Sequence, residues 1–368
     1  MSELIKLSKN SSFSIDCIRF LAAEIVVVGH GLWDFDYAKI YFKWFPLQDF
    51  AVLIFFILSG FLISYSLAIK INTKSYSFKE YFIDRFSRIY SALIPCLIII
   101  AVLDFIFINF IGRNYEYSYN LNIKTFFGNA LMLQDYPILL HLKYFLMASR
   151  NSIVYISTFG SGRPLWSLAV EWWMYMCFGW LLLRNHSNTK KSFYYIVLLL
   201  FSIVPIYNLF SGSKTEGLTV VWIMGCLVTI LLNYNRQIKN INNGFLSIIF
   251  SIIGVITAVH FNSGYHILTA LLFTFSFYFL ILFTNKSTFK VPVFFHNIVK
   301  YGAGYSFTLY LLHYSILQYL LVFPSNYSPF ARFCLYFLIS NVLAFTIAQF
   351  TEVRYKQFSN YLKLKFIK

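Results

Sequence analysis

Long apolar runs recur along the whole chain, and short polar segments separate them. A helix of roughly 20 apolar residues is long enough to cross the hydrocarbon core of a bilayer. The pattern therefore predicts an all-α, polytopic integral membrane protein that forms a single domain over residues 1–368. About ten membrane-spanning helices are expected, near residues 14–33, 49–69, 89–110, 165–183, 193–210, 217–233, 245–261, 265–284, 301–322 and 330–351.

Composition supports the membrane class. Of the 368 residues, 59% are hydrophobic and 12% are charged, with a mean hydropathy of +0.65, whereas soluble domains contain about a quarter charged residues. The net charge of +16 does not indicate a nucleic-acid partner, because the basic residues lie in short clusters beside apolar runs. The five cysteines lie apart within apolar runs, which favours buried thiols. The first ten residues lack the apolar core of a signal peptide, so we expect none to be cleaved.

The distribution of lysine and arginine predicts the orientation. One set of alternate connections, with the two termini, holds twenty of these residues and the other set holds nine. Positive residues concentrate on the cytoplasmic side, so both termini and the loop 70–88 are expected in the cytoplasm. The long connection 111–164 would then lie outside. Its aromatic and amphipathic content favours an ordered lid near the interface.

The first apolar run carries ionisable residues within the membrane. Arg19 and His30 are eleven residues apart, almost three helical turns, so they share a face and lie roughly 16 Å apart along the axis. Charged residues in such a helix normally face a polar interior. Asp16, three residues before Arg19, can form an ion pair that fixes the guanidinium. Glu24 points away from this stripe, which suggests a structural role.

The fourth predicted helix places a carboxylate at the depth of His30. It begins at the outer surface with RPLWSLAVEWW, and helical rise puts Glu171 roughly 10 Å below that surface. A carboxylate beside an imidazole stabilises its protonated form, as a general base requires. The alternative is that each group is satisfied by a separate partner. Trp166 and Ser167 of the same segment are further candidate site residues.

Two more segments carry candidate residues. Arg85 and Arg88 share a face at the predicted cytoplasmic boundary, where two guanidiniums could clamp phosphates, although charge alone favours a positive-inside anchor. Ser59, in FFILSGFLIS, lies near mid-membrane, where small residues allow close helix packing.

The ninth predicted helix carries His313 and Tyr310. This histidine is a site candidate or a core residue bonded to a carbonyl. Asp104 is a further intramembrane carboxylate, for which the sequence names no partner. No histidines show metal-ligand spacing, so we expect no metal site.

Five segments occur in the order found in a known family: IDCIRF with the arginine-to-histidine spacing, FFILSGFLIS, RFSRIY, PLWSLAVEWWMY and SFTLYLLH. Together they resemble the acyltransferase 3 family of multi-spanning membrane acyltransferases. The resemblance implies transfer of an acyl group, usually acetyl, from cytoplasmic acyl-CoA to a carbohydrate hydroxyl at the extracytoplasmic face. It also implies that His30 is the catalytic histidine, Arg19 the arginine of its motif, Arg85 and Arg88 the pair that binds the cofactor, and Glu171 the acidic residue of the fourth-helix motif.

The expected function is therefore a membrane O-acyltransferase that uses acetyl-CoA and modifies a carbohydrate or glycolipid, of the O-antigen or exopolysaccharide type, in a bacterial inner membrane. The sequence does not identify the acceptor, the acyl group or the oligomeric state. A transporter or flippase is the alternative, because intramembrane charges also mark substrate pathways. A silent scaffold would leave the Arg19 and His30 stripe unexplained.

Overall fold

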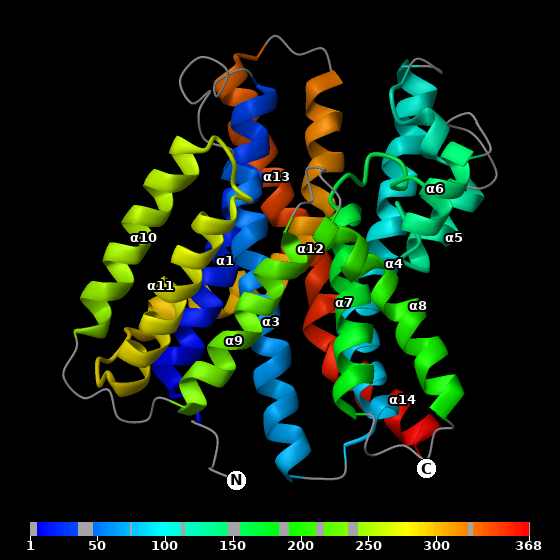
Figure 1. Ribbon diagram of the computed structural model, residues 1–368. Coiled ribbons are helices and arrows are strands. Elements are labelled where there is room, and N and C mark those ends of the chain that lie inside the picture. Colours follow the sequence, from blue (N-terminus) through cyan, green and yellow to red (C-terminus); the bar gives the residue numbers. More distant parts are fainter. Residues whose placement is uncertain are drawn as a thin grey trace. The chain divides into compact units, whose positions relative to one another are not determined.

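The structure is a computed structural model in which every regular element of the described residues is helical (Figure 1). It divides into two compact units, and each is described by itself: unit 1 comprises residues 1–75 and 208–306, and unit 2 comprises residues 76–207 and 307–368. The all-helical class predicted from the apolar runs is confirmed. The residues described are 6–35, 47–73, 76–111, 115–145, 155–183, 191–210, 217–234, 242–322 and 327–367.

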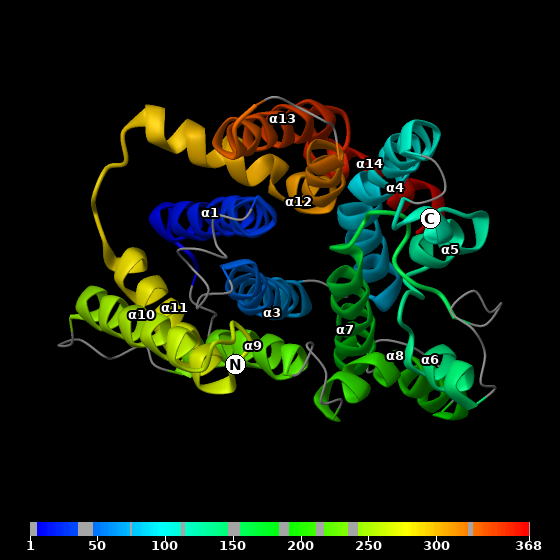
Figure 2. The ribbon, with the colours of Figure 1, turned by 90° about the horizontal axis from the view of Figure 1, so that it is seen from above.

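Unit 1 is a group of packed helices around α3. Helix α3 contacts α1, α9 and α11, and α10 packs along α11 (Figure 2). At the start of α1, the Ser8 side chain accepts a hydrogen bond from the Ser11 backbone N–H, which caps the helix. The elements are α1 (Lys9–Asp34), α3 (Leu47–Thr73), α9 (Leu218–Tyr234), α10 (Asn243–His260), α11 (Ile267–Lys286) and the part of α12 (Val293–Val322) up to Ser306.

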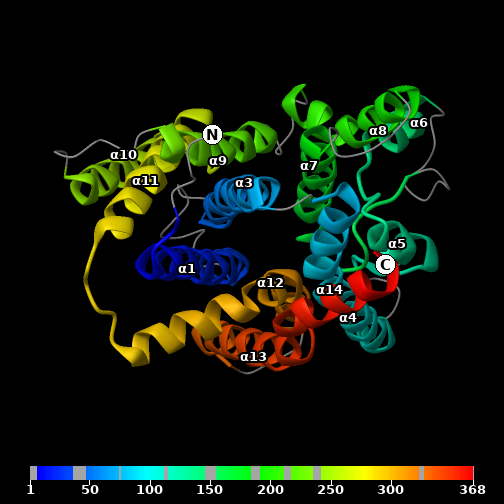
Figure 3. The ribbon, with the colours of Figure 1, turned by 90° about the horizontal axis from the view of Figure 1, so that it is seen from below.

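Unit 2 is built on the long helix α4. The C-terminal helix α14 packs against α4, as Figure 3 shows, and α4 also contacts α5 and α7. The elements are α4 (Phe78–Ile111), η1 (Ser118–Asn120), α5 (Ile123–Ala130), α6 (Pro137–Phe145), α7 (Leu165–Leu183), most of α8 (Lys191–Phe210), the rest of α12, α13 (Pro329–Phe350), η3 (Glu352–Arg354) and α14 (Tyr355–Phe366).

Each of the ten predicted spans falls on a helix. Within the described ranges, six helical stretches are long and apolar enough to cross a membrane. The membrane character is therefore supported, whereas the number of ten crossings and the cytoplasmic termini stay predictions. The six stretches are Leu47–Ile71, Phe78–Phe110, Lys191–Phe210, Asn243–His260, Ile267–Lys286 and Pro329–Phe366.

Several helices begin before the predicted spans because helix and membrane boundaries differ. Helix α4 begins at Phe78, whereas the apolar run begins near residue 89. The intervening turns contain acidic and basic side chains, which a helix tolerates outside the hydrocarbon core. The Arg85 and Arg88 segment is therefore helical, as predicted, at the polar start of α4.

The burial of the five cysteines agrees only in part with the buried thiols predicted from the sequence. All five are free thiols, and Cys96 and Cys226 are buried. Cys17 and Cys177 are half-buried, and Cys334 is exposed on α13. An apolar sequence context does not separate a core position from a helix face directed at lipid, so burial was predicted correctly for two of the five.

Candidate functional site

The predicted ion pair at the start of the α1 stripe is present. Arg19 Nη1 lies 3.5 Å from Asp16 Oδ1, one helical turn earlier. The side chains are 25% and 40% exposed, so the pair orients the guanidinium more than it stabilises the fold. His30 lies further along α1 and is half-buried. The i,i+3 spacing allowed this contact to be predicted from sequence alone.

Glu24 contacts a different helix. The Tyr305 hydroxyl donates to Glu24 Oε1 at 3.5 Å, and the Tyr305 ring meets Phe20 edge-on with ring centroids 6.3 Å apart. Phe20 also lies against Gly302, where an added Cβ would come within 2.4 Å of its ring. This face of α1 packs on the first part of α12, in keeping with the structural role expected for Glu24.

Ser59 is part of a close helix contact. The Trp222 indole N–H donates to Ser59 Oγ at 3.1 Å, so α9 contacts α3 at this position. At the neighbouring Gly60, a Cβ would lie 2.0 Å from the Trp222 carbonyl oxygen. Only glycine fits there, which supports the packing interpretation of the FFILSGFLIS segment.

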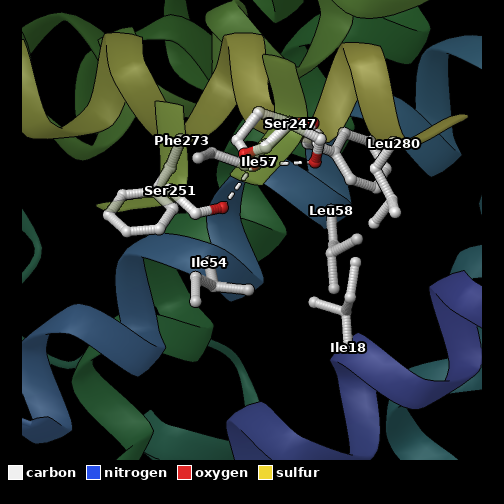
Figure 4. A pocket seen from close by; sticks show the side chains of 10 residues that line it. Ile18, Ile54, Ile57, Leu58, Ser247, Ser251, Phe273 and Leu280 are labelled. Atoms are coloured by element: carbon white, nitrogen blue, oxygen red, sulfur yellow. Dashed lines mark hydrogen bonds between the residues drawn. The ribbon is translucent and has the colours of Figure 1, made fainter. Parts of the chain in front are cut away.

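Unit 1 also contains a cavity of about 300 Å³ (Figure 4). Three serine hydroxyls in its wall bond to one another: Ser251 to Ser276 at 2.6 Å, and Ser247 to Ser276 at 3.3 Å. Because these hydroxyls satisfy one another, the cavity offers a largely apolar surface. It is lined by Ile18, Ile54, Ile57, Leu58, Ser247, Ser251, Phe273, Ser276, Phe277 and Leu280.

The two arginines of α4 have different surroundings. Arg88 Nη2 donates to Glu352 Oε1 at 3.0 Å, and its guanidinium lies over the Tyr355 ring. The Arg85 guanidinium lies over the Tyr81 ring, 5.7 Å from its centroid. Its Nε is buried and has no hydrogen-bond partner in the described part of the chain, where no carboxylate pairs with Arg85 either. Among the described residues, Arg85 is therefore a cation without a counter-ion.

The fourth-helix motif lies at the start of α7. Tyr175 lies one turn further along α7 than Glu171, and its hydroxyl donates to Glu171 Oε1. Trp166, on the first turn of α7, is half-buried. Glu171 belongs to unit 2 and His30 to unit 1, so the pairing expected between them stays a prediction.

Helices α7 and α12 meet through hydroxyl groups. The Ser167 and Tyr310 hydroxyls lie 2.6 Å apart, and Ser167 also donates to the Pro164 carbonyl. His313 is fully buried, and its Nδ1 lies 2.8 Å from the Tyr310 carbonyl oxygen. A carbonyl contact of this kind was one of the two interpretations of His313.

A polar cluster around Asp104 was missed by sequence reasoning. This buried carboxylate accepts hydrogen bonds from the Tyr115 hydroxyl at 2.9 Å, from the Ser161 N–H at 2.7 Å and from Ser161 Oγ at 2.7 Å. The hydroxyl oxygens of Ser161 and of Ser315 on α12 also lie 2.7 Å apart. Burial, with the neighbouring carboxylate, raises the pKa of Tyr115, so the phenol stays protonated and donates.

This cluster ties the connection 111–164 to the helices. At Gly160 the backbone φ is +51°, and a Cβ would lie 2.0 Å from Asp104 Oδ2. The polar run GSGR was the available signal, but Ser161 is 57 residues from Asp104 and no periodicity links them. In the described part of the connection 111–164, an Asn122 capping box begins α5. The lid expected of this connection stays a prediction.

Within the described ranges, no group of three or more His, Cys, Asp or Glu residues lies close enough to hold a metal ion. The site residues that the structure brings together are Asp16 with Arg19, and Ser167 with Tyr310 and His313. Arg85 and Arg88 lie one turn apart on α4.

Comparisons with known proteins support the membrane acyltransferase resemblance. The chain is 31% identical over 163 residues to an uncharacterised protein of Haemophilus influenzae, covering 44% of this chain and 60% of that protein. It is 29% identical over 216 residues to an O-acetyl transferase of Shigella phage Sf6, covering 58% of this chain and 56% of the phage protein.

The chain thus spans somewhat more than half the length of these relatives. No solved structure matches it. The sequence profile of the acyltransferase domain matches residues 12–349, which include every candidate residue described above. The chain therefore belongs to the acyltransferase 3 family.

Proposed function

We propose that the protein is an O-acetyltransferase that moves an acetyl group from acetyl-CoA to a hydroxyl of a cell-surface or exported carbohydrate. The observation that carries the proposal is the family match over residues 12–349. The phage relative described as an O-acetyl transferase supports the choice of acetyl and of an oxygen acceptor. A bacterial inner membrane, with the donor on the cytoplasmic side, is the setting we propose.

Arg85 and Arg88 fit the phosphates of an acyl-CoA. Arg85 has no counter-ion among the described residues, and its Nε is buried without a partner. A phosphate oxygen would satisfy that donor by a charge-assisted hydrogen bond. Arg88, one turn along α4, keeps N–H groups that Glu352 does not use, because a guanidinium has five donors. The pair can therefore bind one or two phosphate groups.

His30 is proposed as the general base of the transfer. It takes the proton of the acceptor hydroxyl as the oxygen attacks the thioester carbonyl, and the carbon–sulfur bond then breaks. The products are the O-acetyl ester and CoA, whose sulfur recovers a proton. Glu171 would stabilise the imidazolium, and Arg19, fixed by Asp16, would line the path. An acyl-histidine intermediate is the less favoured variant.

The test follows labelled acetyl-CoA into the glycan and lipid-glycan fractions of membranes that contain the protein. We expect label in a glycan with the intact protein and a loss of at least 100-fold with His30→Ala, the scale of general-base catalysis. The matched control is His296→Ala, which removes an exposed histidine that stacks on Phe13. Equal transfer by the intact protein and His30→Ala would remove His30 from the mechanism.

The same experiment distinguishes acetyl transfer from the alternative function, transport. A transporter or flippase depends on a gradient and makes no covalent product, whereas acetyl transfer releases one CoA thiol for each ester formed. Solute movement without thiol release would favour transport, in membranes that contain the native glycans.

A further inference from the structure

Glu352 is a buried acidic side chain at the start of η3, just after α13, where the sequence shows no obvious role for it. Only 1% of its side chain is exposed. Its Oε1 accepts from Arg88 Nη2 at 3.0 Å. Its Oε2 accepts from the Thr308 backbone N–H at 2.9 Å and from Thr308 Oγ1 at 3.0 Å. Both oxygens are thus satisfied, which a buried carboxylate requires.

These contacts hold Arg88 in one orientation. Glu352 takes one end of the guanidinium, and the Tyr355 ring supports its face at 4.9 Å. In the described part of the chain, Glu352 is the only hydrogen-bond partner of the Arg88 side chain. The side chain remains 27% exposed, so other N–H groups of the same guanidinium stay accessible. Arg88 thus has one satisfied end and one open end.

We propose that Glu352 is a positioning residue, which holds the open end of Arg88 toward an anionic group of the acyl donor. The inference rests on the proposed function, because it deepens the assignment of Arg85 and Arg88 to acyl-CoA. A free arginine loses side-chain entropy when it binds a ligand, and a fixed one has lost it already. Glu352 would therefore strengthen donor binding without touching the donor.

Glu352 also carries a negative charge, which repels a bound phosphate. Two features would weaken that repulsion. The guanidinium would lie between the two anionic groups, and the partly exposed Arg88 side chain lets water and salt screen the bound phosphate. We therefore expect orientation to outweigh repulsion.

The experiment measures the KM for acetyl-CoA and kcat in Arg88→Ala, Glu352→Gln and the double variant. Glu352→Gln should raise the KM roughly three- to tenfold, the range that one fixed side chain accounts for, with kcat little changed. Added to Arg88→Ala it should change the KM no further, because Glu352 acts through Arg88. If Glu352 had a merely structural role, Glu352→Gln would lower activity both in the otherwise intact protein and in the Arg88→Ala variant.

Two further variants protect the test against loss of folding. Thr308→Val removes one hydrogen bond to Glu352 and should raise the KM in the same direction by a smaller factor. Lys363→Gln removes the other ion pair to α4, 2.5 Å from Asp84, and should leave the KM unchanged. If the KM for acetyl-CoA is unchanged or lower in Glu352→Gln but raised in Arg88→Ala, the positioning role of Glu352 is overturned, and the assignment of Arg88 to the donor site stands. An unchanged KM in Arg88→Ala would remove Arg88 from the donor site, and the positioning role with it.

Discussion

At the residue scale, the side chains of the candidate site are held by contacts of two kinds, local ones within a helix and distant ones between helices. The Asp16 and Arg19 pair follows from i,i+3 spacing, and the His313 contact with the Tyr310 carbonyl lies within one helical turn. The Arg88 and Glu352 pair joins residues 264 apart, and no local pattern encodes it. Sequence reasoning therefore identified Arg88 but not the residue that holds it.

Arg85 gives the clearest prediction at this scale. Arg85→Ala should weaken acetyl-CoA binding about tenfold or more, because it removes charge-assisted hydrogen bonds of about 1.5–3 kcal/mol. Stability should change little, because Arg85 has no ion-pair partner within the described residues. Calorimetric titration of the purified protein with CoA measures the first effect, and thermal unfolding in detergent measures the second.

The matched control removes two exposed cations from the same predicted side of the membrane, Lys290→Ala with Lys300→Ala. If both proteins lose affinity equally, the effect is general electrostatic attraction. Unchanged binding in Arg85→Ala would remove Arg85 from the donor site.

At the element scale, apolar runs located the helices, and small residues located one close contact. Each predicted span coincides with a helix, and Gly60 lies where α3 meets α9. Helix α14 was not predicted, because it is short and charged and thus lacks the apolar run by which the other helices were recognised. It is held instead by Asp84, which accepts from Ser359 at 2.8 Å and pairs with Lys363.

The α3 and α9 contact should be sensitive to a single methyl group. At Gly225, an added Cβ would lie 2.2 Å from the Ile57 carbonyl oxygen, and backbone cannot move aside cheaply. Gly225→Ala should therefore destabilise unit 1 by about 1–3 kcal/mol, the usual cost of overpacking. Thermal unfolding in detergent, followed by the accessibility of buried cysteines, measures the loss.

Gly244→Ala is the control on α10. The three atoms nearest to its Cβ would belong to the Phe283 ring, the first at 3.2 Å, and a side chain can shift slightly to relieve such a contact. Equal stability of the two variants would contradict the packing explanation of the α3 and α9 contact.

At the scale of the whole molecule, composition was sufficient to predict the class of protein but not the way in which its helices are organised into units. Apolar content predicted an all-helical membrane protein, and the order of five motifs predicted the family that the sequence profile matches. The division into two units was not foreseen, because unit 1 joins residues 1–75 with residues 208–306. Hydrophobic periodicity reports which face of a helix is buried, and it does not name the partner.

The family and the charge distribution together give the account its central claim. We propose that acetyl-CoA is used on the side where the positive residues concentrate, and that the acceptor hydroxyl is modified on the other side. Inside-out membrane vesicles separate these compartments, because they expose the cytoplasmic face and enclose the other.

The most direct test supplies labelled acetyl-CoA outside sealed inside-out vesicles that enclose the acceptor glycan. The account predicts labelled ester on the enclosed glycan and an equal amount of CoA thiol outside, both abolished by His30→Ala. Intact labelled acetyl-CoA inside the vesicles, with neither ester nor free thiol, would contradict the account and identify a transporter.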